Sequence, residues 1–226
     1  MREIVLDTET TGLNPKDGHR VIELGCLELI NHLPSGRTFH SYFNPEREVP
    51  FAATEIHGLT WDDLKGQPIF AHQVDLFLEF IANDRLVIHN AEFDLGFLNA
   101  ELGRLKLTSI GIDRAVDTLK IARQKYPGAP ASLDALCRKF SINNTMRDKH
   151  GALLDADLLA QVYVELIDAR QPALGLAAVT AGDVKESGSV NTHRLPRVYA
   201  PSQEELLHHR SLLKKLTKPI WLLALW

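Results

Sequence analysis

The chain has 226 residues, of which 45% are hydrophobic and 24% are charged, so it can bury one substantial core and is not disordered by composition. No apolar run reaches the roughly 18 residues of a membrane span, and no signal-peptide pattern precedes the first strand, so we expect a cytoplasmic protein without membrane contact. The two cysteines, Cys26 and Cys137, exclude a disulfide framework and a cysteine zinc site, and we expect buried thiols.

The formal charge of −4 is unevenly distributed along the chain. Residues 1–169 carry a net charge of −8, whereas residues 170–226 carry a net charge of +4. A domain this acidic has no general attraction for nucleic acid. If it acts on a polyanion, cations must neutralise its site and another component must deliver the substrate.

Apolar strands and turn sequences alternate in the N-terminal part of the chain. The strands are predicted over residues 4–7, 21–29 and 38–43. Turn compositions over residues 12–18 and 31–36 separate them, which is typical of an antiparallel meander.

Helices and short strands are predicted to alternate in the middle of the chain. Residues 50–58 form a short helix or a loop, and apolar spacing predicts a helix over 68–82. The later elements are a strand over 86–88, a helix from 94, a strand over 114–118, and helices over 119–125, over 133–140 with Ser132 as its cap, and after 150. We therefore expect an α/β domain with a mixed central sheet flanked by helices.

The C-terminal part is predicted to be a flexible linker followed by a helical segment. Residues 180–192 are rich in small and polar residues, and Ser202 with Glu205 resembles a capping box. The helix and the end of the chain carry a set of large apolar residues: Leu206, Leu213, Leu216, Trp221 and Trp226. This segment is too short to build its own core, so we expect it to dock on a partner; folding back onto the first domain is the alternative.

Four carboxylates stand at places where a fold can bring them together. Asp7 and Glu9 are two residues apart at the end of a strand and therefore share a face. Asp94 follows a buried strand, and Asp155 lies in the first turns of a helix. Singly, each suits an ordinary loop or helix start, but together they suit a site for divalent cations.

The chemistry that four such carboxylates support is phosphoryl transfer with two divalent cations, which stabilise the attacking and leaving oxygens. Oxygen ligands favour Mg²⁺ or Mn²⁺, and the absence of a Cys/His cluster argues against zinc. His150, five residues before Asp155, is a candidate general base for the attacking water. Solvent-exposed or capping roles are expected for the histidines that show no shared spacing, which are His19, His32, His40, His72, His89, His193, His208 and His209.

Asp7, Glu9, Asp94, His150 and Asp155, in this order and context, resemble the histidine branch of the DEDD 3′→5′ exonuclease superfamily. The resemblance covers residues 1–169 and implies a ribonuclease-H-like fold. It also implies that the four carboxylates bind the metal ions and that His150 is the catalytic base.

The same resemblance implies a pocket for the terminal nucleotide. The substrate-binding residues expected from it are Asp7, Glu9, Thr10, Ile56, His57, Phe93 and Asp155. For His57 and Phe93, a loop histidine and a core aromatic are the alternative interpretations.

Within the superfamily, the chain is most similar to the proofreading (epsilon) subunits of bacterial DNA polymerase III, on the segments 5–12, 89–91, 132–137 and 150–156. This resemblance implies an exonuclease domain over 1–172, a linker over 173–198 and a segment over 199–226 that binds the catalytic (alpha) subunit. It leaves open whether a small accessory subunit binds the exonuclease domain.

Residues 171–176 resemble a motif that docks bacterial proteins on the sliding clamp. Gln171, Leu174 and Leu176 are its tentative contact residues, and the last position is Leu where Phe is commoner. A motif this short also arises by chance, so clamp binding is a hypothesis.

The expected function is removal of mispaired nucleotides from a DNA 3′ end as a proofreading 3′→5′ exodeoxyribonuclease that releases nucleoside monophosphates. A stand-alone exonuclease acting on RNA or oligoribonucleotide 3′ ends is the alternative within the same class. A non-catalytic tether between polymerase and clamp is the alternative from another class.

Overall fold

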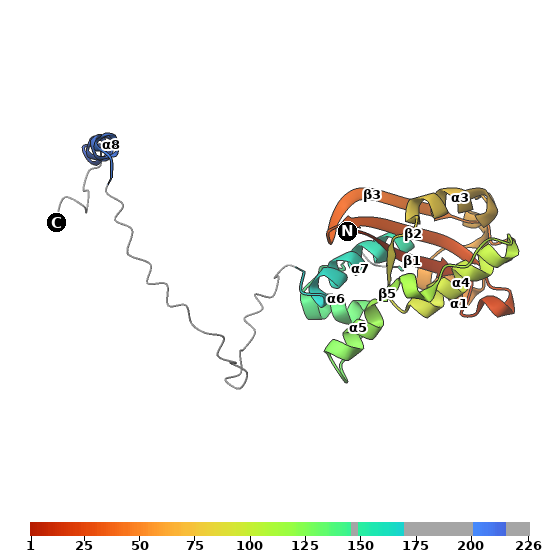
Figure 1. Ribbon diagram of the computed structural model, residues 1–226. Coiled ribbons are helices and arrows are strands. Elements are labelled where there is room, and N and C mark those ends of the chain that lie inside the picture. Colours follow the sequence, from red (N-terminus) through yellow and green to blue (C-terminus); the bar gives the residue numbers. More distant parts are fainter. Residues whose placement is uncertain (146–148, 170–200, 216–226) are drawn as a thin grey trace, which may run out of the picture. The chain divides into compact units, whose positions relative to one another are not determined.

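Figure 1 shows the computed structural model, which describes residues 1–145, 149–169 and 201–215. The chain divides into two compact units, Met1–Gly175 and Leu176–Trp226, and each is described by itself. The segments predicted as linker and clamp motif, with Gln171, Leu174 and Leu176, lie outside the described residues. Leu216, Trp221 and Trp226 also lie outside them.

A five-stranded mixed sheet in the order β3-β2-β1-β4-β5 forms the centre of the first unit. Its strands are β1 (Arg2–Thr10), β2 (Val21–Ile30), β3 (Leu33–Tyr42), β4 (Arg85–Ile88) and β5 (Ala115–Asp117). β1, β2 and β3 pair antiparallel, and β4 and β5 continue the sheet parallel to β1. This confirms the predicted meander and the mixed sheet.

β3 begins at Leu33, five residues before the predicted start. The sequence there, with Pro34 and Gly36, has turn composition, but the reversal occurs earlier at Asn31 and His32, which both have positive φ. β3 lies at the edge of the sheet, where a proline is tolerated because its missing N–H can face away from the ladder.

Helices connect and cover the strands. They are α1 (Phe51–His57), α2 (Trp61–Leu64), α3 (Phe70–Ile81), α4 (Ala91–Arg104), α5 (Thr118–Lys125), α6 (Leu133–Phe140) and α7 (Ala152–Leu166), with 3-10 turns at Pro15–Asp17 and Ile112–Arg114. Residues 51–57 are thus helical, and the unexpected α2 is held by a capping box between Thr60 and Asp63. Ser132 caps α6 as predicted.

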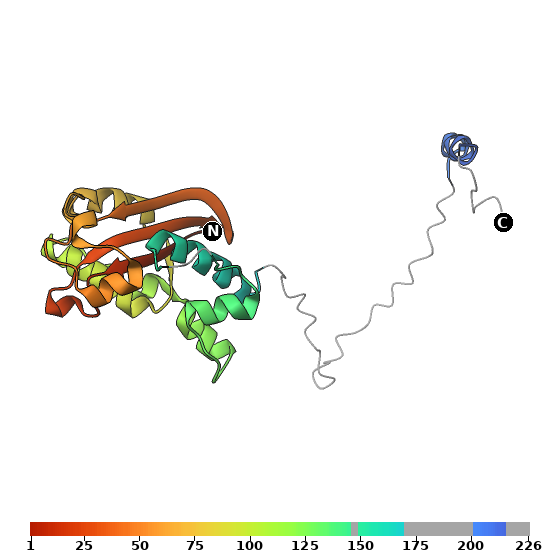
Figure 2. The ribbon, with the colours of Figure 1, turned by 180° about the vertical axis from the view of Figure 1, so that it is seen from behind.

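The two faces of the sheet bury separate apolar clusters, which follow from the alternation along β1. Ile4 and Leu6 pack with α3 and α4, whereas Val5 packs with α5, α6 and α7. Figure 2 shows α5, α6 and α7 beside one another. Cys26 belongs to the first cluster and Cys137 to the second, and both thiols are free and buried as expected.

The second unit contains α8 (Gln203–Leu213), which begins at the predicted capping box of Ser202 and Glu205. Leu206 and Leu213 are half-buried, whereas Leu207 and Leu212 are 63% and 55% exposed. Across both units, none of the helices in the described ranges is long and apolar enough to cross a membrane.

Candidate active site

The predicted carboxylates meet where β1 and β4 end. The two strands are neighbours and run parallel, so their carboxyl ends lie at the same edge of the sheet. This edge is the usual place for a site in an open α/β sheet. β1 supplies Asp7 and Glu9, α4 supplies Asp94 directly after β4, and α7 supplies Asp155. A cavity of about 260 Å³ is lined by all four carboxylates and by His150.

Asp94 is fixed to β1 by Thr8. The backbone N–H and the hydroxyl of Thr8 both donate to Asp94 Oδ1, at 3.0 and 2.7 Å. Alternation along β1 explains the arrangement, because Thr8 points to the α4 side while Asp7 and Glu9 point with Val5 to the α7 side.

Asp155 reaches the sheet because α7 begins very close to β2. Gly25 pairs with Asp7 in the β1–β2 register. A Cβ at Gly25 would lie 2.4 Å from backbone atoms of Ala152 and Leu153. Only glycine at this position allows the first turn of α7 to approach the strand and bring Asp155, 2% exposed, to the same edge. The sequence analysis did not identify Gly25.

His150 lies immediately before α7 at the mouth of the cavity. Its Nδ1 is 3.2 Å from Asp155 Oδ2, and its side chain is 45% exposed. Its backbone N–H donates to the carbonyl of Ile56 at 3.2 Å, which links it to the end of α1. Ligand atoms of Glu9, His150 and Asp155 all lie within 4.8 Å of one another, a spacing at which they could hold one cation.

The electrostatics of Asp94 also suit a cation site. Burial raises the pKa of Asp94 to about 7, although the hydrogen bonds from Thr8 act in the opposite direction. A nearby cation favours the carboxylate form and offsets this cost. The oxygen-rich donor set therefore fits the hard divalent ions expected from the sequence.

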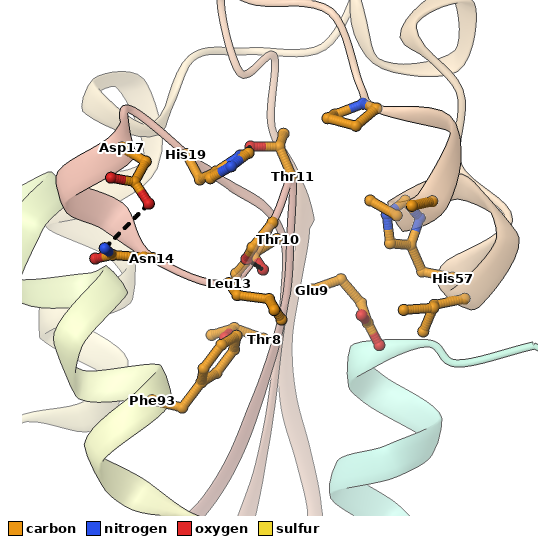
Figure 3. Close-up of a pocket in the computed structure, with 15 residues that line it drawn as sticks. Thr8, Glu9, Thr10, Thr11, Leu13, Asn14, Asp17, His19, His57 and Phe93 are labelled. Carbon is orange, nitrogen blue, oxygen red and sulfur yellow. Dashed lines mark hydrogen bonds between the residues drawn. The ribbon is translucent and has the colours of Figure 1, made fainter.

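A second cavity of about 560 Å³ adjoins the acidic one and shares Thr8, Glu9 and Phe93 with it. Figure 3 shows Leu13 and Phe93 on one side of this cavity and His57 on the other, with Glu9 between them. Thr10 and Ile56 also line it, whereas Asp7 and Asp155, the other residues expected to bind substrate, line the acidic cavity.

His57 lies in the wall of this cavity as a neutral histidine. Its Nδ1 accepts a hydrogen bond from the Leu59 N–H at 3.0 Å, which leaves the proton of the neutral ring on Nε2. Nε2 is buried and has no partner among the described residues. Burial lowers the pKa of His57 to about 4, and the charges of His150 and Lys149 act in the same direction.

Several residues that line the two cavities were not predicted from the sequence. They are Leu13, Asn14, Asp17 and His19 in the larger cavity, and His89, Ser132 and Asp134 in the acidic one. His19 and His89 were expected to have solvent-exposed or capping roles. The loop of residues 12–19 is shaped by Gly12, because a Cβ there would lie 2.4 Å from the His19 ring. Residue spacing in the sequence does not predict that the His19 ring packs against Gly12.

Comparison with known proteins gives matches along nearly the whole chain. Residues 4–163 match the exonuclease family of the RNase T type. The DNA polymerase III subunit epsilon of Rickettsia conorii is 46% identical over 224 residues, covering 96% of this chain and 97% of the relative. The DNA polymerase III subunit epsilon of Salmonella typhimurium is 40% identical over 230 residues, covering 96% and 94%.

Two solved nucleases have a similar fold. Exonuclease X, solved in complex with 5′ overhanging duplex DNA, has a TM-score of 0.59 at 23% identity over 74% of this chain and 91% of that chain. The nuclease domain of 3′hExo, a DEDDh family member bound to rAMP, has a TM-score of 0.65 at 20% identity over 74% and 92%. The likeness confirms the predicted ribonuclease-H-like exonuclease fold.

Proposed function

Since this chain belongs to the exonuclease family of DNA polymerase III epsilon subunits, we propose that the cluster where β1 and β4 end is its catalytic centre. The chain is a metal-dependent proofreading 3′→5′ exonuclease that forms part of a DNA polymerase III. The observation that supports the residue assignment is the convergence of Asp7, Glu9, Asp94, Asp155 and His150 on one cavity.

The four carboxylates are the residues that would hold the metal ions. When bound, two divalent cations stabilise the charge on the attacking and leaving oxygens of the phosphodiester. We assign Mg²⁺ or Mn²⁺ because the donor set is dominated by carboxylate oxygens. Thr8 keeps Asp94 in place for this task through its two hydrogen bonds.

His150 takes the proton from the water that attacks the terminal phosphodiester. Its exposed position at the cavity mouth lets it pass the proton on to solvent, and Asp155 orients the ring through Nδ1. Cleavage of the bond between phosphorus and the 3′ oxygen releases a nucleoside 5′-monophosphate, and the leaving oxygen takes a proton from solvent to become the new 3′ hydroxyl of the shortened strand.

The larger cavity receives the terminal nucleoside. Phe93 offers an aromatic face for the base, and His57 forms part of the opposite wall. Thr10 and Ile56 complete the wall. A mispaired end frays at lower cost than a paired one, so this pocket favours mismatched ends.

The rest of the chain connects the nuclease to its polymerase. We assign residues 1–172 to the exonuclease domain, 173–198 to a linker and 199–226 to the segment that binds the catalytic (alpha) subunit. Leu206 and Leu213 on α8 are the described candidates for that contact. Clamp docking through residues 171–176 and binding of a small accessory subunit belong to the same proposal. A subunit of this assembly works on DNA in the bacterial cytoplasm.

The test is digestion of a 3′-labelled, mispaired primer–template by the full chain in Mg²⁺. We expect release of nucleoside monophosphates, and we expect His150→Ala to be slower by roughly a factor of 10² or more because it lacks the base. His72→Ala is the matched control, since His72 is an exposed histidine on α3 that lines neither cavity. Hydrolysis by His150→Ala at the wild-type rate would refute the assignment of the base.

The same assay separates the alternatives. A preference for RNA oligomers of the same sequence over DNA would favour a stand-alone exonuclease acting on RNA. A tether without catalysis would release nothing and would be indifferent to Asp7→Ala. The match to epsilon subunits along 96% of the chain argues against both alternatives.

A further inference from the structure

Arg20, the residue after the cavity-lining His19, forms a part-buried bidentate ion pair with Glu101. Arg20 Nε donates to Glu101 Oε1 at 2.7 Å, and Nη2 donates to Oε2 at 2.9 Å. The two side chains are only 15% and 3% exposed. A bidentate pair of this geometry fixes both the orientation and the separation of the two side chains.

The loop of residues 12–19, one wall of the cavity, is closed at its base by Arg20. The Thr11 N–H donates to the Arg20 carbonyl at 3.0 Å, and the Arg20 N–H donates to Thr11 Oγ1 at 3.0 Å. Leu13 and His19 belong to this loop and line the cavity, as Figure 3 shows.

The free end of the Arg20 guanidinium contacts the segment that leads into the second wall of the larger cavity. Arg20 Nη1 donates to Glu46 Oε2 at 3.0 Å and to the carbonyl of Pro45 at 3.4 Å. The segment of residues 45–50 leads directly into α1, which carries Ile56 and His57.

The third wall is α4, where Glu101 lies seven residues after Asp94. Seven residues are close to two helical turns, so both carboxylates lie on the same face of α4. Asp94 is held by Thr8 at the first turn, and Glu101 is held by Arg20 and by the Val21 N–H at 3.4 Å. Two carboxylates thus fix α4, and with it Phe93, against the strands.

We infer that Arg20 and Glu101 are positioning residues that set the width of the terminal-nucleotide pocket. Neither residue lines the cavity, but Arg20 joins the three segments that do. A pocket wall that shifts loses packing contacts to its ligand and so weakens ligand binding. This inference rests on the assignment of the larger cavity to the terminal nucleoside.

Arg2 provides a matched control at the opposite end of β1. It also makes part-buried ion pairs, from Nε to Glu28 and from Nη1 to Asp84, and its side chain is 22% exposed. It lines neither the nucleotide pocket nor the acidic cavity. Arg2→Lys therefore disrupts the ion pairs of a part-buried guanidinium with two carboxylates, without a path to the pocket.

The experiment compares Arg20→Lys, Glu101→Gln and Arg2→Lys in the full chain. For each variant, KM and kcat are measured on a 3′-labelled single-stranded DNA, the affinity for a nucleoside 5′-monophosphate is measured by direct binding with Mg²⁺, and Tm is recorded. We expect all three to lower Tm by several degrees. Only the first two should raise KM and weaken monophosphate binding, by at least roughly threefold, with a smaller change in kcat.

Unchanged KM and monophosphate affinity in Arg20→Lys, or an equal change in Arg2→Lys, would overturn the inference. Should a single variant fail to fold, the double substitution Arg20→Met and Glu101→Met removes both charges together and avoids an unpaired buried ion. We expect it to keep the weakened monophosphate binding. Lack of hydrolysis by the wild type would refute the proposed function instead, while the direct binding measurement would still test the positioning role.

Discussion

Asp94 illustrates how much a single residue depends on its surroundings. Its burial raises the pKa to about 7, so the carboxylate is disfavoured in the folded chain without a cation. Thr8 limits this cost with two donors, and a cation in the cavity would offset it further. The same feature that costs stability therefore makes the site receptive to a divalent ion.

His57 leads to a prediction of pH-dependent stability. Its pKa is about 4 in the folded chain, below the ordinary value of 6.5, because the ring is buried. Between pH 6.5 and 4 the unfolded chain binds a proton at His57 that the folded chain does not, so stability falls as the pH falls through this window. We expect wild type to lose roughly 1–2 kcal/mol more than His57→Gln between pH 7 and pH 5.

Urea denaturation at both pH values measures this difference. His72→Gln, with its exposed imidazole on α3, is the control and should follow the wild type. Equal losses in wild type and His57→Gln would contradict a buried, neutral His57.

The start of α7 leads to a prediction for Gly25. An alanine there would place its Cβ 2.4 Å from the backbone of Ala152 and Leu153, and a backbone cannot swing aside as a flexible side chain can. α7 would have to shift, and Asp155 would move away from Asp7. We expect Gly25→Ala to lower stability by roughly 1–3 kcal/mol and kcat by roughly tenfold or more.

Thermal denaturation and steady-state kinetics on the same preparation test both effects. Gly66→Ala is the control, because nothing lies within 4 Å of a Cβ at Gly66 and the residue is exposed. Wild-type kcat in Gly25→Ala would show that the close approach of α7 is not needed for catalysis.

Local sequence patterns were enough to predict the helices, the strands and the acidic residues of the site. They could not predict packing between residues that are far apart in the sequence. Asp7 and Glu9 follow from strand alternation, which needs only neighbouring residues. Gly25 looks in sequence like an interruption of an apolar strand, and its role appears only when α7 lies beside it. Arg20 and Glu101 are 81 positions apart, so no spacing rule could pair them.

At the scale of the whole molecule, the negative charge of the first 169 residues is consistent with delivery of DNA by a polymerase partner. The first 169 residues carry a net charge of −8, so the nuclease has little general attraction for DNA. A polymerase that already holds the primer end can supply it at high effective concentration through the proposed linker. Weak intrinsic affinity also spares correctly paired ends that are not held by the polymerase.

A chain that ends at residue 172 tests this division of labour. The described core of the first unit is intact without α8, so we expect single-stranded DNA to be digested with kcat/KM within roughly twofold of the full chain.

With the catalytic subunit of the polymerase added, mismatch removal by the full chain should accelerate by roughly 10²-fold, and removal by the shortened chain should not. Leu206→Asp with Leu213→Asp in the full chain should behave like the shortened chain, because both changes put charge on the half-buried side of α8. Equal acceleration of all three proteins would show that the polymerase contacts the nuclease domain itself.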